Sequence, residues 1–445
     1  MMMRKKLSLL LAVLFVFSLL LSACASGTNQ GGQDQGDKSA NQTAQKVEIR
    51  LSTWAGAEEA KQLQAILDDL NKKSTTYTIV QDSNPAEYDT RIITQLSGAS
   101  GPDLFWVSAQ RAAQFAAQGA MLDITDRLAK SDHPAAKTDD YFENSLKPFT
   151  NNGKIYGLPW LEQPVMLYVN KDLFDQANVS YPDGSWTWDT FLDAAKKLTM
   201  DVNGKHPGES GFDAKNIKQW GFTLNGWPPV QMFIWQNGGE VIAEDFSESP
   251  IDSPKAMEAF KFYADLVNSP YVPSQQLIRD RGFDAMYKNQ QVAMFMGGAA
   301  DSLDWDVTFK SQAFEVPAGP TGIHATFGDI LGMGINAKTK NPDAAFQALL
   351  DLTDAIHHWK IMPPRKSLAD VQLLQKLHPE KAHSLDAIVK SMNYATSYRY
   401  FTNYPDWDNI FWTQLMDPIV NAKGDPTKLV PKVKPQLDAV LQRAK

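Results

Sequence analysis

The sequence predicts an α/β fold in two lobes, built on a largely parallel sheet. Segments with strand and helix periodicity alternate as β-α-β-α-β between residues 47 and 107, and this order favours parallel pairing with right-handed crossovers. About 400 residues remain after an N-terminal leader and tether are set aside, which is more than one hydrophobic core usually holds. Two extended segments, residues 153–171 and 326–335, are suited to cross between the lobes.

The N-terminus predicts export and lipid attachment. Basic residues at positions 4–6 precede an apolar run at residues 7–21, which is too short to favour a membrane span. The sequence LSAC that follows resembles the bacterial lipobox, so we expect removal of a signal peptide of residues 1–23 and lipidation of Cys24. Cys24 is the only cysteine, which excludes an internal disulfide and gives lipid attachment as the role of the thiol.

Residues 24–45 are expected to form the lipidated start of the mature protein and a flexible tether. Residues 25–45 are small and polar, with almost nothing to bury. We therefore expect a protein outside the cytoplasm, held by Cys24 on the outer face of the cell membrane, as in a Gram-positive-type surface lipoprotein.

The β-α-β-α-β region brings candidate binding residues to one edge of the expected sheet. Trp54, Asn84 and Trp106 lie at or just past the carboxyl ends of the expected strands, where open α/β sheets bind ligands. The strands are expected at residues 47–53, 76–81 and 104–107, and the helices at residues 56–73 and 86–96.

The rest of the chain continues the alternation less regularly. Pro159 and Pro164 punctuate residues 153–171, and since proline is poorly suited to the centre of a sheet, this segment is expected to cross between lobes instead. Thr187 is expected to cap a helix whose Trp188 faces the core. Further on we expect a helix at 254–267, a strand at 291–296, a second crossing at 326–335, a helix at 342–352, and a helical tail at 406–441 with a break near 424–426.

Six segments of the mature chain resemble one protein family in order and spacing. They are GPDLFW (101–106), YGLP (156–159), LYVNKDLF (167–174), SWTWDTF (185–191), QVAMFMGG (291–298) and GMGIN (332–336). The family is the family 1 extracellular solute-binding proteins of ABC importers, which includes the maltose- and maltodextrin-binding proteins.

The resemblance implies a two-lobe, periplasmic-binding-protein-like fold with a hinge and a ligand cleft between the lobes. Residues 46–161 and about 327–357 would form the N-terminal lobe, and residues 162–326 and about 358–445 the C-terminal lobe. The lobes would close over a sugar, and the resemblance to maltodextrin-binding proteins implies an oligosaccharide. The closed form would then be presented to the permease subunits of the importer.

Sugar recognition needs aromatic faces for C–H patches and polar groups for hydroxyls. The resemblance implies stacking roles for Trp106, Trp227 and Trp407. It also places a polar residue of the first crossing in the cleft, and either Glu162 or Gln163 fits that description. The family tends to have a bulky aromatic residue after the paired glycines, but this chain has alanine there. The pocket is therefore expected to be wider at this point, or Trp305 is expected to supply the stacking ring.

Other candidates for hydroxyl groups are less specific. They are Glu58, Asn84, Asp301 and Arg365. Glu58 opens an expected helix, where an acid is favourable without any ligand, and Arg365 is equally suited to a surface ion pair.

Several function classes are disfavoured by the sequence. A net charge of -8 argues against a nucleic-acid partner, and the chain lacks serine-hydrolase, zinc-protease and phosphate-loop motifs. His357 and His358 are adjacent and point about 100° apart on a helix, so a shared metal is not expected. We expect a monomeric binding protein with no cofactor, no metal and no catalytic residues. The alternatives are a binding protein for a peptide or a polyol phosphate, an adhesive surface lipoprotein, and a glycan-active enzyme.

Overall fold

The computed structural model describes residues 46–98, 101–224 and 229–443. Its first part is the expected β-α-β-α-β unit, in which β1 pairs in parallel with both β2 and β3. The unit consists of β1 (Val47–Thr53), α1 (Ala57–Lys73), β2 (Tyr77–Ser83), α2 (Tyr88–Ser97) and β3 (Leu104–Ser108). The predicted elements are confirmed here to within two residues or so at each end, because strand alternation and the helical spacing of Leu63 and Leu67, both buried, are strong local signals.

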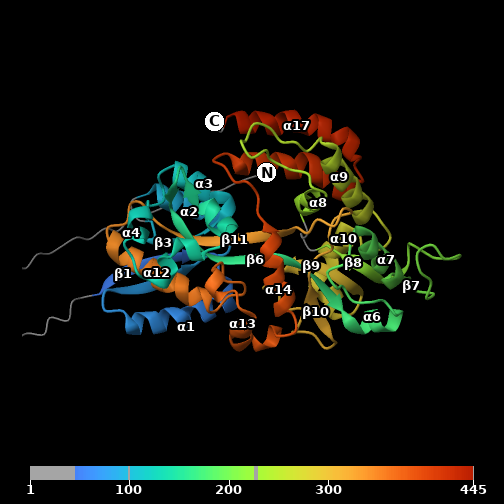
Figure 1. Cartoon of the computed structure of the whole chain (residues 1–445), viewed down its shortest axis with the longest axis horizontal. Helices are drawn as coiled ribbons and strands as arrows, with labels where there is room; N and C mark the ends of the chain where they lie inside the picture. The colour runs from blue at the N-terminus through green and yellow to red at the C-terminus, as the bar shows by residue number, and fades with distance from the viewer. Residues whose placement is uncertain (1–45, 99–100, 225–228, 444–445) are drawn as a thin grey trace, which may run out of the picture. The chain divides into compact units, whose positions relative to one another are not determined.

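Two long strands, β6 (Gly157–Asn170) and β11 (Thr326–Ile335), run antiparallel through the middle of the molecule. Figure 1 shows them side by side between two groups of helices. The sheet order is β2-β1-β3-β11-β6-β9-β8-β7. The expectation of a largely parallel sheet is therefore wrong for β11 and β6, and holds for β1 with β2 and β3 and for β8 with β9.

The prolines of β6 do not keep it out of the centre of the sheet, contrary to the sequence-based expectation. Pro159 lies at a β-bulge, where the register between β6 and β11 shifts, and Pro164 is the last residue paired with β11. From Val165 onward β6 pairs instead with β9 (Val292–Gly298). Both prolines therefore occupy positions where the hydrogen-bond ladder is already interrupted.

The cores of the two lobes are the two largest of the hydrophobic clusters formed by the described residues. One draws its buried residues from positions 49–161 and 330–356, and the other from positions 165–316, 327 and 401–441. We call them the N-lobe and the C-lobe. The change from one cluster to the other falls within β6, between Leu161 and Val165, and within β11, between Phe327 and Ile330.

The remaining elements surround these cores. Those of the N-lobe are α3 (Ala109–Ala117), α4 (Thr125–Ala129), α5 (Glu143–Leu146), β4 (Thr150–Asn151), β5 (Lys154–Ile155) and α12 (Pro342–His357). The first part of the C-lobe contains α6 (Lys171–Ala177), α7 (Trp188–Leu198), β7 (Met200–Asp201), β8 (Ile217–Thr223), α8 (Val230–Gln236), α9 (Pro254–Val267), α10 (Gln275–Arg281), α11 (Phe283–Lys288) and β10 (Ser311–Phe314). Its last part contains α13 (Val371–Leu377), α14 (Leu385–Ser391), β12 (Ala395–Thr396), α15 (Tyr404–Ile410), a π-helical segment (Phe411–Met416), α16 (Asp417–Ala422) and α17 (Pro426–Gln442).

The described residues contain no helix that is both long and apolar enough to cross a membrane. The predicted signal peptide, the lipidated Cys24 and the tether all lie outside these residues.

Candidate functional site

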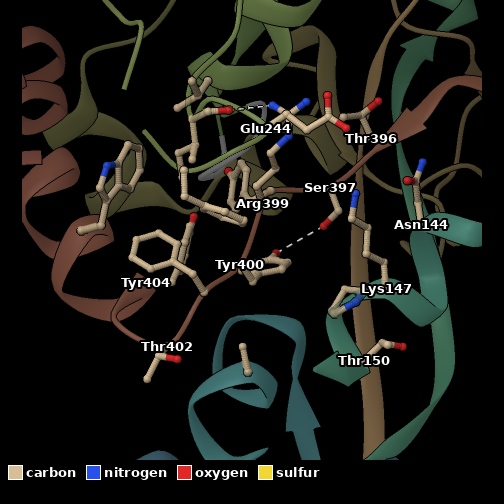
Figure 2. Close-up of a pocket in the computed structure, with 18 of the residues that line it drawn as sticks. Asn144, Lys147, Thr150, Glu244, Thr396, Ser397, Arg399, Tyr400, Thr402 and Tyr404 are labelled. Carbon is tan, nitrogen blue, oxygen red and sulfur yellow. Dashed lines mark hydrogen bonds between the residues drawn. The ribbon is translucent and has the colours of Figure 1, made fainter. Parts of the chain in front are cut away.

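A pocket of about 510 Å³ lies between the lobes, and we call it the interlobe pocket. Its N-lobe wall comes from α3 and from the segment that leads from α5 into β4, and its C-lobe wall comes from the loop after α8 and the segment between β12 and α15. Figure 2 shows side chains from these segments facing one another across the space. The size is within the usual range for small-molecule sites.

Aromatic rings of the C-lobe cover much of one side of the interlobe pocket. Tyr398 lies 5.9 Å from both Trp235 and Tyr404, measured between ring centroids, and Tyr404 stacks on Trp407 at 5.9 Å. Tyr400, 4.8 Å from Tyr404, packs against the hydrophobic clusters of both lobes. Such ring faces suit the apolar C–H patches of a sugar.

The segment that carries these rings is fixed at both ends. β12 pairs with the start of β11, and α15 begins with Pro405 in its first turn, a position that suits proline. Tyr400 accepts a hydrogen bond from the Ser397 hydroxyl at 3.3 Å, as Figure 2 shows. The strand pairing, the helix start and the Ser397 hydrogen bond together position the rings of this segment.

Charged groups surround the aromatic side of the pocket. Arg399 forms an ion pair with Glu240 and donates a hydrogen bond to the carbonyl of Ile242 at 2.7 Å, which fastens the loop after α8. Lys147 and Glu244 are exposed and line the pocket from opposite lobes. These groups offer both donors and acceptors to a polar ligand.

The two crossing strands bring a polar pair together near the pocket. Gln163 of β6 lies opposite Asp329 of β11 in the register, and its Nε2 donates to Asp329 Oδ2 at 3.2 Å. Gln163 Oε1 accepts from the backbone N–H of Ala300 at 3.3 Å. Burial raises the pKa of Asp329, and the hydrogen bond from Gln163 opposes that shift. Sequence reasoning missed Asp329, although an acid within the apolar, glycine-rich strand 326–335 is a visible signal.

Glu162 occupies a different environment from its neighbour Gln163. Its side chain is 1% exposed and accepts a hydrogen bond from the Ser145 hydroxyl. Burial raises the pKa of Glu162 to about 7, although the Ser145 hydrogen bond lowers it. Of the two residues that the sequence left open, Gln163 is the one that is partly exposed beside Asp329. A ligand contact by either residue stays a prediction.

Trp106 lies in the middle of β3, so its expected place at the strand end is wrong. Its side chain is 0% exposed, with ring centroids 5.1 Å from Trp54 and 4.6 Å from Trp160. The Trp106 indole N–H has no acceptor among the described residues. Trp54 covers this cluster and is partly exposed, so it is the member of the cluster that a ligand could reach without rearrangement.

The side chains of Trp407 and Arg365 both make their contacts within the protein. Trp407 lines the interlobe pocket but is 0% exposed, stacked on Phe411 at 4.9 Å. Arg365 is buried and forms ion pairs with Asp140 and Asp354, at 3.0 Å and 2.6 Å. The sequence suggested a surface ion pair as the alternative role for Arg365. Arg365 does form ion pairs, but the expectation of a surface position is wrong, because the arginine side chain is only 7% exposed.

The other predicted residues are scattered. Asn84 donates to Asp82 Oδ1 at 2.5 Å, and Glu58 is exposed in the first turn of α1. The predicted stacking residue Trp227 lies outside the described residues. Asn84 and Glu58 are not among the residues that line the interlobe pocket, and the ligand contacts of all three residues stay predictions.

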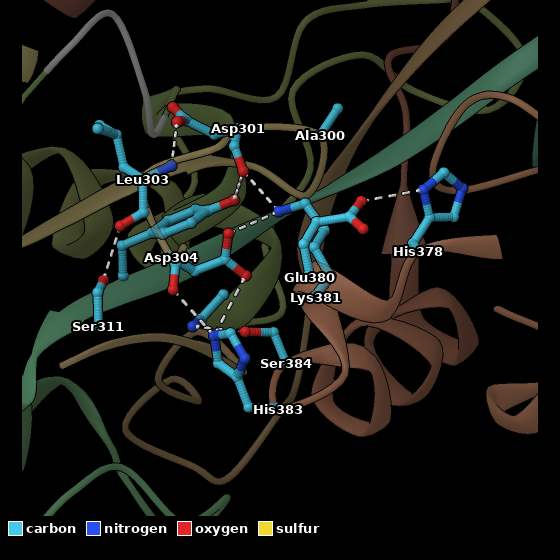
Figure 3. Close-up of polar contacts among 12 residues, drawn as sticks. Ala300, Asp301, Leu303, Asp304, Ser311, His378, Glu380, Lys381, His383 and Ser384 are labelled. Atoms are coloured by element: carbon cyan, nitrogen blue, oxygen red, sulfur yellow. Dashed lines mark hydrogen bonds and ion pairs between the residues drawn. The ribbon is translucent and has the colours of Figure 1, made fainter. Parts of the chain in front are cut away.

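Asp301 and Trp305 belong to a loop that the C-lobe holds firmly. Figure 3 shows Lys381 donating to the Asp301 carbonyl, at 2.5 Å, and to Asp304 Oδ1, at 2.8 Å. Asp301 Oδ1 accepts from the backbone N–H of Leu303 at 3.0 Å, and burial raises the pKa of Asp301. Trp305 is 47% exposed on the same loop. These contacts tie the loop to Lys381, while the Trp305 ring stays accessible from solvent.

Two further expectations concern metal binding. No group of three or more His, Cys, Asp or Glu side chains that could hold a metal ion occurs in the described part of the chain. His357 is the last residue of α12 and is buried, at 1% exposure, and its Nε2 lies 3.0 Å from the carbonyl oxygen of Pro159.

Comparisons with known proteins agree with this architecture. A family model described as bacterial extracellular solute-binding protein matches residues 55–350. The maltodextrin-binding protein of Bacillus subtilis (strain 168) is 22% identical over 338 residues, which cover 74% of this chain and 74% of that protein.

Solved structures show the same fold. An ABC substrate-binding protein from Listeria monocytogenes, in complex with cycloalternan, aligns with a TM-score of 0.74 at 23% identity and covers 89% of this chain and 100% of that chain. A protein from Mycobacterium tuberculosis in complex with glycerophosphocholine aligns with a TM-score of 0.72 at 16% identity, covering 89% and 98% of the two chains. The fold is that of two-lobe binding proteins with a hinge and a cleft.

Proposed function

Because this chain belongs to the bacterial extracellular solute-binding proteins, we propose that it captures an oligosaccharide between its lobes and delivers it to an ABC-type importer. The observation that supports a sugar most directly is the interlobe pocket of about 510 Å³, where tyrosine and tryptophan rings lie beside charged and amide side chains. This combination matches a ligand with apolar faces and a hydroxylated edge.

Delivery would depend on lobe closure. β6 and β11 are continuous through both lobes, and Tyr400 packs against both hydrophobic clusters. A ligand that touches both walls of the pocket stabilises the closed arrangement over the open one, and only this difference in affinity shifts the population. The closed surface would then be what the importer permease recognises.

The proposed location is the outer face of the cell membrane. The support is the basic start, the short apolar run and the LSAC sequence, with Cys24 as the lipidated residue. Residues 25–45 would then tether the binding domain to the membrane while leaving it free to capture solute. We propose that the protein acts as a monomer and that it binds its ligand without converting it.

Calorimetric titration of the mature protein tests the sugar assignment. We would titrate maltotetraose, cycloalternan, glycerophosphocholine and a tetrapeptide separately. Heat of binding with an oligosaccharide, together with a smaller radius of gyration by X-ray scattering, is the expected result. Binding of glycerophosphocholine alone would instead support the polyol-phosphate alternative, and binding of the peptide alone would contradict the sugar assignment.

A variant of a pocket residue tests whether the sugar binds in the interlobe pocket. Trp235→Ala removes a ring that lines the pocket, and the loss of one stacking contact should weaken oligosaccharide binding by about 1 to 3 kcal/mol, with base stacking as a rough analogue. Tyr181→Ala is the matched control, because Tyr181 is an aromatic residue of the C-lobe that packs on Phe314 outside the pocket. Equal weakening by both variants would argue against the pocket as the binding site.

A further inference from the structure

Asp329 is an acidic residue placed where the two lobes join. It lies in β11 between Gly328 and Ile330, and its register partner in β6 is Gln163. The cluster membership of β11 changes between Phe327 and Ile330, so Asp329 belongs to the stretch that passes from one lobe to the other. Asp329 is not itself among the residues that line the interlobe pocket, but the pairing of Phe327 with Thr396 of β12, which does line it, places Asp329 beside the C-lobe wall of the pocket.

The Asp329 carboxylate has few partners of its own. Among the described residues, Gln163 Nε2 is the one hydrogen-bond donor to the Asp329 side chain, and no lysine or arginine forms an ion pair with it. The Gln163 amide is oriented by a second hydrogen bond, because its Oε1 accepts from the Ala300 N–H at 3.3 Å in the space that the absent side chain of Gly298 leaves open. The amide therefore presents one fixed donor to Asp329.

Asp329 is also close to the aromatic side of the interlobe pocket. Burial raises the pKa of Tyr398 and of Tyr400, both of which line the pocket, and the negative charge of Asp329 raises them further. The phenols therefore stay protonated. The cations of this pocket do not neutralise Asp329, because Arg399 pairs with Glu240 and no ion pair joins a lysine or arginine to Asp329 among the described residues. A partly buried carboxylate with a single neutral donor is unfavourable unless further donors reach it.

We infer that Asp329 is a ligand-binding residue that accepts hydrogen bonds from donor groups of the solute, namely hydroxyl or ammonium groups. This inference rests on the proposed function and adds a preference for solutes with hydrogen-bond donors over solutes with a negative charge. A solute that brings a carboxylate or phosphate to this position would face an unpaired negative charge and would be rejected. Gln163 is a positioning residue, because it fixes the orientation of the carboxylate from the side away from the ligand.

The test compares Asp329→Asn with the parent protein. Asparagine keeps the size of the side chain and removes the charge, so the strong charge-assisted bond to a hydroxyl becomes a weaker neutral one. We expect maltotetraose to bind about 10- to 100-fold more weakly by calorimetric titration. Asp306→Asn is the matched control, because Asp306 is a C-lobe acid whose side chain is 56% exposed and pairs with Lys288.

Two further measurements make the inference falsifiable. Maltotetraose oxidised to carry a terminal carboxylate should bind the parent protein more weakly than maltotetraose does, and Asp329→Asn should reduce this discrimination at least threefold. The melting temperature of ligand-free Asp329→Asn should equal or exceed that of the parent, because a poorly paired charge has been removed.

The outcomes separate the inference from the proposed function. If the parent binds maltotetraose and Asp329→Asn binds it equally well, the inference is wrong and the proposed function stands. If Asp329→Asn melts at a lower temperature than the parent, and the loss of stability accounts for all of the loss of binding, Asp329 is structural and the inference is again wrong. If the parent binds no oligosaccharide, the proposed function fails, and this inference fails with it.

Discussion

Replacing Glu162 with glutamine should change the pH dependence of folding stability. The Glu162 carboxyl is 1% exposed and accepts one hydrogen bond, from the Ser145 hydroxyl. Burial raises its pKa from the ordinary 4.5 to about 7. The folded protein therefore binds this proton more tightly than the unfolded chain does, so the contribution of Glu162 to stability is complete below pH 4.5 and is lost as the pH rises through about 7.

The size of this effect follows from the separation of the two pKa values. An interval of 2.5 pH units at about 1.4 kcal/mol per unit gives an upper bound of about 3.5 kcal/mol for the whole titration, most of which falls between pH 4.5 and pH 8. Glutamine does not titrate. The extra amide N–H groups of Glu162→Gln cost some free energy, but that cost is the same at every pH and cancels in the comparison.

Urea unfolding followed by tryptophan fluorescence measures the difference. We expect the free energy of unfolding of Glu162→Gln relative to the parent to rise by about 2 to 3 kcal/mol from pH 4.5 to pH 8. Glu244→Gln is the control, because Glu244 is exposed, and its difference from the parent should not change with pH. A difference between Glu162→Gln and the parent that stays constant across this range would refute the reasoning.

Three further substitutions test the packing by urea unfolding. In Gly332→Ala a Cβ would lie 2.3 Å from the Phe149 ring, so the free energy of unfolding should fall by about 1 to 3 kcal/mol, and Phe149→Leu in the same chain should recover part of it. Lys381→Met leaves Asp304 buried without its cation and should cost about 3 to 5 kcal/mol, which Asp304→Leu should largely restore. Trp106→Ala should cost about 3 to 5 kcal/mol as a core truncation, and a cost under 1 kcal/mol would contradict its burial.

Local sequence patterns were sufficient for most elements. The helix at 254–267 and the strand at 326–335 have the predicted bounds, because Pro254 at a helix start and an apolar stretch ended by Asn336 are signals within a few neighbouring residues. The helix start at Thr187 and the burial of Trp188 were predicted on the same basis.

Local sequence patterns could not predict the strand order of the sheet or most of the candidate site. That β11 lies between β3 and β6 depends on pairing across more than 150 residues, which periodicity does not encode. The pairing also decides that Gln163 meets Asp329. Trp106 was misplaced because an apolar run gives the extent of a strand but does not say which of its members reaches solvent.

The position of β11 constrains how the chain acquires its structure during synthesis. β3 and β6 are the neighbours of β11 in the sheet, and both precede it in the sequence by the length of most of the C-lobe. Until residue 335 has been made, the N-terminal strands lack their central neighbour and β6 has an open edge. A nascent chain of this design stays incompletely paired until β11 has been synthesised, so the two lobes must complete their structure together.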